Sequence, residues 1–321
     1  KANESGNATI TLLQDATTGE RLDFAKSATL DLNGNTLSCT AYFADDYETM
    51  VAITTNGAKL MIIDSIGGGK LDGTGTTFVL LLGRPGAVGF TVTSSVHISG
   101  GTVSGAVRMV EGTSMTVSGG TVERNAAAST INIYTNATLN VSGGQILNTY
   151  SSSSAYAIIN EGTLNITGGT VSGSIGVRNS NSGTVNISGN ANITGTERSV
   201  ESNTDDEGAL TITGGSYTGG IKISGGTATI GGGRYTGGIV VSGGTATISG
   251  GTITESSAEN AVEVSGSAEL IISDGTFSAT AGETYDTGVY VHDGGTVKIA
   301  GGTITSTAYG VYNERGSATI T

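Results

Sequence analysis

The phrase Leu164-Asn165-Ile166-Thr167-Gly168-Gly169-Thr170-Val171 decides the fold, because it returns along most of the chain. Close copies stand at 96–103, 115–122 and 139–146, and further copies follow up to the end of the sequence. From Ile98 onward, the apolar residue that precedes the Ser or Thr recurs after 18 to 27 residues. Repeats of this length are typical of solenoids, in which each repeat packs on its neighbours.

Each repeat contains three short segments with the properties of strands. Apolar and polar residues alternate, as in 163–167, and β-branched residues dominate, so each segment has one buried face. The segments run in the same direction between glycine corners, so each must pair with the next coil rather than form a hairpin. The sequence therefore predicts an all-β protein, a single-stranded parallel β-helix of about 13 coils of about 18–27 residues, with three short strands per coil.

Alignment of the repeats predicts which side chains share a column. Tyr217 and Tyr235 fall in an inward column, so we expect them in the core, with each hydroxyl reaching a corner. Asn160, Asn179 and Ser202 also face inward, and we interpret them as a structural ladder bonded to one another and to corner backbone groups, with a polar ligand site as the alternative. The strand that closes each coil also gives an outward column, namely Arg108, Asn132, Ile159, Arg178, Glu201, Lys222, Val240, Glu263, Tyr290 and Tyr312.

Composition narrows the classes of partner. The 321 residues include 54 glycines but only one proline, which excludes collagen. The 14 basic and 27 acidic residues give a net charge of −13, which disfavours nucleic acid and anionic membranes as partners. The sequence has no apolar run long enough for membrane insertion, which needs about 18 residues. Cys39 is the single cysteine, so no internal disulfide is possible.

We predict one β-helix domain over 1–321. Residues 1–95 would form less regular N-terminal coils with longer loops, and 96–321 the regular Gly-Gly-Thr repeats. The sequence stops within a coil, and a solenoid needs a polar cap over its terminal core. We therefore expect truncation at the C-terminus, as part of a longer multidomain chain.

Two further phrases make a resemblance specific. "ATITLLQDAT" at 8–17 and "ATLDLNGNTL" at 28–37, followed by the Ser-Gly-Gly-Thr repeats, resemble the pectate-lyase-like right-handed β-helix regions of surface proteins from Gram-positive, often gut, bacteria. The resemblance implies a right-handed coil, export, display on a cell wall, and contact with glycans or host surfaces.

Catalytic motifs of β-helix enzymes are mostly missing. Asn203-Thr204-Asp205-Asp206 matches one motif of the polygalacturonase type, but His97 and His292 stand outside that family's other motifs. Glycoside hydrolysis needs two carboxylates held about 5–10 Å apart, and no column supplies such a pair. We therefore predict no catalytic residues, and a polysaccharide lyase or glycoside hydrolase stays open as the alternative.

A metal site is a further open question in the acidic segment at 201–207. Glu201, Asn203, Asp205 and Glu207 alternate oxygen ligands that could hold Ca²⁺ loosely, although they lack the spacing of a dedicated calcium loop. A solvated acidic loop is the favoured interpretation. We expect no other cofactor.

Two groups of residues are candidates for carbohydrate binding. The loop residues Tyr42, Asp45, Asp46 and Tyr47 combine rings and carboxylates suited to sugars, although the rings could instead cap the N-terminal core. The outward residues Glu263, Tyr290 and Tyr312 form the second group, in which the tyrosine ring faces could stack on a glycan that runs along the coils. The alternative there is that exposed tyrosines simply suit strands.

These observations favour a non-catalytic extracellular surface module, an adhesin or polysaccharide-binding rod. We expect a bacterial protein that is secreted or anchored at the cell surface, with a polysaccharide or host-surface glycan as partner. Outward pairs such as Thr170/Ser172 and Thr252/Thr254 also leave an ice-binding solenoid open, and a passive stalk is the remaining alternative.

Overall fold

The computed structural model describes residues 7–40, 51–55, 57–83, 93–205, 207–256, 260–282 and 286–321. Strands are the only regular elements in these ranges. The contacts divide the chain into two compact units, Lys1–Ser172 (unit 1) and Gly173–Thr321 (unit 2). Each unit is described by itself below.

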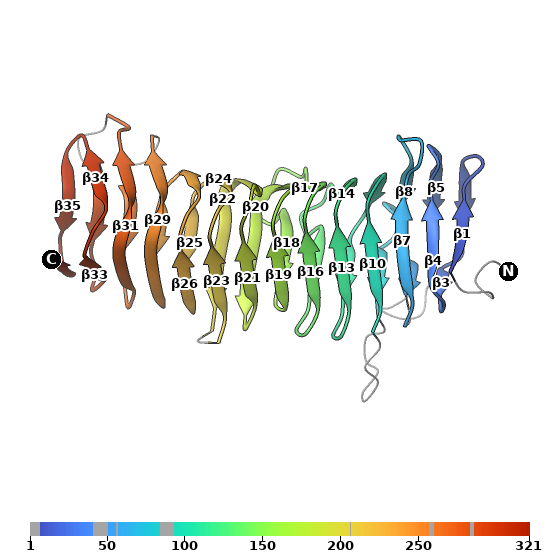
Figure 1. The fold of residues 1–321 in the computed structure, drawn as a ribbon, viewed down its shortest axis with the longest axis horizontal. Coiled ribbons are helices and arrows are strands. Elements are labelled where there is room, and N and C mark those ends of the chain that lie inside the picture. Colours follow the sequence, from blue (N-terminus) through green and yellow to red (C-terminus); the bar gives the residue numbers. More distant parts are fainter. Residues whose placement is uncertain are drawn as a thin grey trace. The chain divides into compact units, whose positions relative to one another are not determined.

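In unit 1, drawn from blue to green in Figure 1, the described strands form three parallel sheets, which we name A, B and C. Sheet A consists of β1 (Ala8–Thr11), β4 (Ala28–Asp31), β7 (Lys59–Ile63), β10 (Ser95–Ile98), β13 (Ser114–Val117), β16 (Thr138–Val141) and β19 (Thr163–Ile166). Sheet B consists of β2 (Ala16–Thr18), β5 (Thr36–Cys39), β8 (Lys70–Asp72), β11 (Thr102–Ser104), β14 (Thr121–Arg124), β17 (Gln145–Asn148) and the start of β20 (Thr170–Asn181). Sheet C consists of β3 (Leu22–Phe24), β6 (Val51–Thr55), β9 (Phe78–Leu82), β12 (Val107–Met109), β15 (Ile131–Ile133) and β18 (Tyr156–Asn160).

Unit 2 has the same three sheets, and some of its strands bend from one sheet into the next. Sheet A consists of β21 (Thr184–Ile187), β23 (Ala209–Ile212), β26 (Thr227–Ile230), β29 (Thr245–Glu255), β31 (Glu269–Ala279), β33 (Thr296–Ile299) and β36 (Ser317–Ile320). Sheet B consists of the start of β22 (Asn192–Thr204), β24 (Ser216–Thr218), β27 (Arg234–Thr236), the ends of β29 and β31, and β34 (Thr303–Ser306). Sheet C consists of the ends of β20 and β22, β25 (Ile221–Ile223), β28 (Ile239–Val241), β30 (Asn260–Val264), β32 (Thr287–Val291) and β35 (Tyr309–Asn313).

The pairing register confirms the predicted repeat. Ile98 pairs with Val117 and Val117 with Val141 in unit 1, in parallel orientation. Ile230 pairs with Ile248 in the same way in unit 2. Each strand thus pairs with the strand one coil away, as a parallel β-helix requires, and the predicted fold class is correct.

Glycine corners allow the coils to approach closely. Gly120, the second glycine of its pair, has a φ of 69°, a region that side chains with a Cβ avoid. A Cβ at Gly120 would lie 2.5 Å from the Gly101 carbonyl oxygen of the preceding coil. The repeated Gly-Gly is therefore required by both the backbone turn and the coil spacing.

The interior is apolar, and some of its buried polar side chains donate hydrogen bonds to backbone carbonyls at the corners. Tyr217 and Tyr235 are 1% and 0% exposed and lie in direct register, so the prediction that they pack in the core is correct. Asn160 donates to the Gly162 carbonyl at 3.2 Å, and Asn179 donates to the Gly183 carbonyl at 2.9 Å. Both buried amides therefore bond corner backbone, as the structural interpretation predicted.

Candidate functional site

Three of the predicted binding residues come together on sheet C of unit 2. Glu263 on β30 pairs with Tyr290 on β32, and Tyr290 pairs with Tyr312 on β35, so one residue of each successive coil stands in direct register. Their side chains project outward, because the residues on either side of them along the strands face the core. The other predicted group, Tyr42, Asp45, Asp46 and Tyr47, lies outside the described residues.

Aromatic rings extend this column into a continuous stack. The Tyr290 and Tyr312 ring centroids are 5.6 Å apart with planes inclined by 9°, and Tyr309 lies 5.1 Å from Tyr312. On the same strand as Tyr290, the His292 ring lies 4.5 Å away, inclined by 17°. His292 reaches back toward Glu263 on the preceding coil, whereas Tyr312 lies on the following coil. The two rings therefore flank Tyr290 on opposite faces.

His292 is held between two carboxylates. Its Nε2 lies 3.0 Å from Glu263 Oε1, and its Nδ1 lies 3.0 Å from Asp293 Oδ2. Only the protonated imidazolium can donate from both nitrogens. Partial burial opposes the charge, but the hydrogen bonds and charges of Glu263 and Asp293 outweigh it and raise the pKa of His292 above its ordinary value. The side chain is 18% exposed, and both ring nitrogens lie within hydrogen-bond distance of a carboxylate.

A second set of polar contacts surrounds Tyr290. Its hydroxyl donates to Glu314 Oε2 at 2.5 Å, and this bond, with some desolvation, raises the pKa of Tyr290 to about 12. The Arg315 guanidinium lies 3.0 Å from Asp293 Oδ1 and 3.8 Å from Glu314 Oε1. Arg315 is 69% exposed, so these ion pairs contribute little to stability but fix the charge pattern of the surface.

We name this surface the aromatic–acidic strip. It consists of Glu263, Tyr290, His292, Asp293, Tyr309, Tyr312, Glu314 and Arg315. Because its neighbours cover both faces of Tyr290, that ring presents its edge to solvent. Stacking of a sugar on the face of Tyr290, which the sequence suggested, would first require His292 or Tyr312 to move. Without such a movement, a ligand would meet ring edges, hydroxyls and carboxylate oxygens.

Sequence reasoning did not identify His292, Asp293, Glu314 or Arg315 as part of the site. A signal for His292 was present, since residues two apart on a strand share a face and His292 follows Tyr290 by two positions. Glu314 and Arg315 come from the corner after β35, where no periodicity sets the direction of a side chain.

The acidic segment at 201–207 is separate from the strip in the sequence. Its Asp205 side chain accepts hydrogen bonds from the same turn and from Ser182. Asp205 Oδ2 accepts a hydrogen bond from Ser182 Oγ at 2.9 Å, and Asp205 Oδ1 accepts one from the Glu207 backbone N–H at 3.1 Å. Among the described residues, no group of three or more His, Cys, Asp and Glu side chains could hold a metal ion. Asp206 lies outside those residues, so the loose Ca²⁺ site stays a prediction.

Comparison of the chain with protein-family models, with curated proteins and with solved structures gave no match. The part of the chain that the structure describes contains no helix with the length and hydropathy needed to cross a bilayer.

Proposed function

We propose that this chain is a non-catalytic extracellular module that binds polysaccharide through the aromatic–acidic strip. The observation that carries the proposal is the direct register of Glu263, Tyr290 and Tyr312 on three successive coils. Coils stack at the spacing of paired strands, about 4.8 Å, which is close to the length of one sugar unit. An extended glycan that runs across the strands would meet one outward side chain of this column at each step, first Glu263 and then the two tyrosines.

The charges of the strip favour an uncharged glycan. Glu263, Asp293 and Glu314 supply carboxylate oxygens, which accept hydrogen bonds from sugar hydroxyls. Three carboxylates of the strip face one permanent cation of the strip, Arg315. An acidic polymer would be repelled by the carboxylates of the strip, so we propose a neutral polysaccharide as the ligand class of this site.

The proposed location of the module in the cell rests on the repeats of the sequence and not on the strip. The phrases at 8–17 and 28–37 and the Ser-Gly-Gly-Thr repeats support a pectate-lyase-like β-helix region of a Gram-positive bacterial surface protein. On this proposal the chain is exported and displayed at the cell surface as an adhesin, where a polysaccharide or a host glycan is its partner.

A glycan array with the 321-residue chain tests the proposal. We expect the wild-type chain to bind at least one neutral polysaccharide, and the double variant Tyr290→Ala/Tyr312→Ala to bind it at least tenfold more weakly, or about 1.4 kcal/mol. Tyr150→Ala is the matched control, because Tyr150 is a similarly exposed tyrosine of unit 1, 44% against 41% for Tyr312.

Three outcomes would count against the proposal. Unchanged affinity of the double variant would move the site to the loop that contains Tyr42 and Tyr47. Absence of binding to every polysaccharide would leave a passive stalk. Release of reducing ends or unsaturated products in the same assay, abolished by Asp205→Asn, would establish the enzyme alternative.

A further inference from the structure

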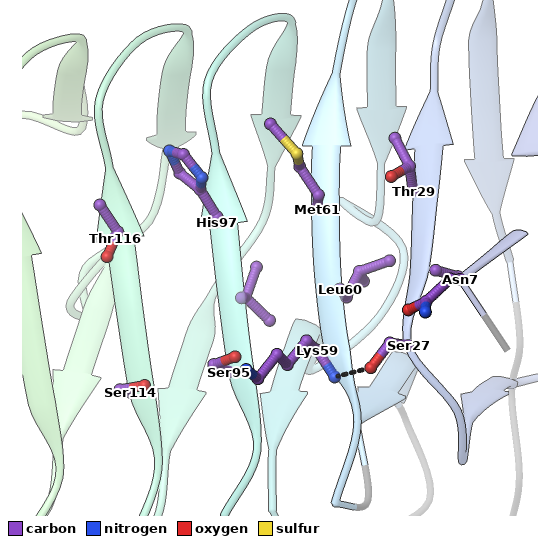
Figure 2. Close-up of a pocket in the computed structure, with 12 residues that line it drawn as sticks. Asn7, Ser27, Thr29, Lys59, Leu60, Met61, Ser95, His97, Ser114 and Thr116 are labelled. Atoms are coloured by element: carbon purple, nitrogen blue, oxygen red, sulfur yellow. Dashed lines mark hydrogen bonds between the residues drawn. The ribbon is translucent and has the colours of Figure 1, made fainter. Parts of the chain in front are cut away.

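A concave surface lies on sheet A of unit 1, far along the sequence from the aromatic–acidic strip. It is a groove of about 560 Å³ that crosses β4, β7, β10 and β13 (Figure 2). We name it the sheet A groove. Its floor is the outward face of four successive coils, so its lining repeats from coil to coil.

Two rows of side chains line the sheet A groove. One row holds Ser27, Lys59, Ser95 and Ser114, of which Lys59, Ser95 and Ser114 are in direct register. Every member of this row can donate a hydrogen bond from its side chain. The Lys59 side chain extends from β7 toward Ser95 on β10 (Figure 2).

The second row lies two residues further along each strand. It holds Thr29, Met61, His97 and Thr116, all in direct register. Met61 is 37% exposed and offers an apolar, adaptable surface between polar neighbours. His97 Nε2 lies 2.8 Å from Ser118 Oγ, which fixes the ring beside Met61 on the groove floor (Figure 2).

The charge of the lining is the opposite of that of the chain. Unit 1 carries eight basic and thirteen acidic residues, a net charge of −5, yet none of the described residues that line the groove is acidic. Lys59 is exposed and forms no ion pair with any residue that the structure describes. The groove is thus a local exception, with an uncompensated ammonium group among hydroxyls.

We propose that the sheet A groove binds a stretch of acidic polysaccharide. A carboxylate or sulfate of the ligand pairs with Lys59, the hydroxyls of Ser27, Ser95 and Ser114 bond the sugar oxygens, and Met61 contacts the apolar side of a ring. This site is separate from the strip in the sequence and takes an acidic ligand, whereas a neutral one is proposed for the strip.

Calorimetric titration of the 321-residue chain with oligogalacturonate and with dextran sulfate tests the proposal, because the two probes separate a carboxylate from a sulfate. We expect Lys59→Ser to weaken binding of the better probe at least fivefold. Lys298→Ser is the matched control, since Lys298 is also an exposed, outward lysine of sheet A, on β33 in unit 2, and the variant has the same net charge. Equal affinities of these two variants would overturn the proposal, and so would a wild-type chain that binds neither probe.

A gain-of-function pair gives an independent readout. Thr116→Lys adds a second cation within the groove, whereas Thr229→Lys adds one to sheet A of unit 2, outside it. We expect only Thr116→Lys to tighten binding of the acidic probe, by at least threefold, and equal effects of the two would again contradict the proposal. The strip variant Tyr290→Ala/Tyr312→Ala should leave acidic-probe binding unchanged, so failure of either binding proposal can be recognised separately.

Discussion

Tyr217 and Tyr235 lie face to face in the core of unit 2, with ring centroids 4.7 Å apart and planes inclined by 10°. Each hydroxyl donates to a corner carbonyl, Tyr217 to Gly214 at 2.7 Å and Tyr235 to Gly232 at 2.5 Å. Burial raises the pKa of both phenols, so they stay neutral donors at physiological pH. A stacked aromatic pair contributes about 0.5–1.5 kcal/mol beyond its buried area, and the polar ends are satisfied.

Removal of one hydroxyl should show what the corner bond contributes. We expect Tyr235→Phe to lower the free energy of unfolding by about 0.5–1.5 kcal/mol, the net worth of one hydrogen bond, as measured by urea denaturation. Tyr150→Phe serves as the control, because that ring is 44% exposed and its hydroxyl can be hydrated. A Tyr235→Phe variant as stable as the control would mean that the bond adds nothing.

Two adjacent residues of β26 test the register. Ile230 is 0% exposed, so Ile230→Asp would bury an unpaired carboxylate at a cost of several kcal/mol, and we expect several coils to unfold together. Thr229 is exposed, and Thr229→Asp should change stability by no more than about 0.5 kcal/mol. Thermal denaturation followed by circular dichroism distinguishes them, and equal melting temperatures would refute the inward and outward assignment.

Glycine-to-alanine substitutions at two different corners should lower the free energy of unfolding by different amounts, strongly at Gly120 and weakly at Gly75. In Gly120→Ala, the left-handed backbone alone costs about 1–2 kcal/mol, and the new Cβ would also meet the Gly101 carbonyl oxygen. In Gly75→Ala, the new Cβ would have no atom within 4 Å, so we expect a change within about 0.5 kcal/mol. Urea denaturation of both variants checks the difference, and a mild Gly120→Ala would show that the coils can separate at this corner.

Protonation of His292 should stabilise unit 2 over a defined pH range. Because the folded pKa is raised, the stabilisation is complete below the unfolded pKa, about 6.5, and disappears as the pH rises through the folded value. Each unit of pKa difference corresponds to about 1.4 kcal/mol. NMR titration of the ring should give a pKa above that of His292 in the unfolded chain, and His292→Gln should remove this part of the pH dependence of stability. A normal NMR pKa would contradict the double hydrogen bond to Glu263 and Asp293.

The single thiol should report on the unfolding of unit 1. Cys39 is 1% exposed, and burial, with the nearby Asp72 charge, raises the pKa of its thiol to about 11. Since the thiolate is the reactive form, we expect a thiol-labelling reagent at pH 8 to modify Cys39 only after urea has opened the coil. Rapid labelling of the native chain would contradict this expectation and show that the coil opens without urea.

The coil architecture could be predicted because the phrase that forms the corner also sets the register. Ile230 and Ile248 occupy the same place in successive copies, 18 residues apart, and they pair directly. Their alternation with polar residues shows which face is buried. Sheets A, B and C could therefore be predicted from the periodicity, because the same alternation of apolar and polar residues makes each strand bury one face.

The contacts within the candidate sites could not be predicted in this way. The hydrogen bond between His292 and Glu263 depends on side-chain directions on two coils, and the sequence period fixes only the position of each Cα. The sheet A groove was hidden for another reason. Ser27, Lys59 and Ser95 are separated by 32 and 36 residues, longer than the regular coil, so their alignment could not be recognised from spacing.

Because the 18-residue coils at 213–230 and 231–248 end at equivalent residues, Ile230 and Ile248, either coil could be duplicated or lost by an in-frame genetic event without disturbing any corner. If 231–248 were lost, Ile230 would be followed by Ser249-Gly250-Gly251, and Tyr217 would face Ile253 in place of Tyr235. Chain length can thus vary in whole coils during evolution, and loss of 231–248 would reduce by one the number of repeats that separate the sheet A groove from the aromatic–acidic strip along the sequence.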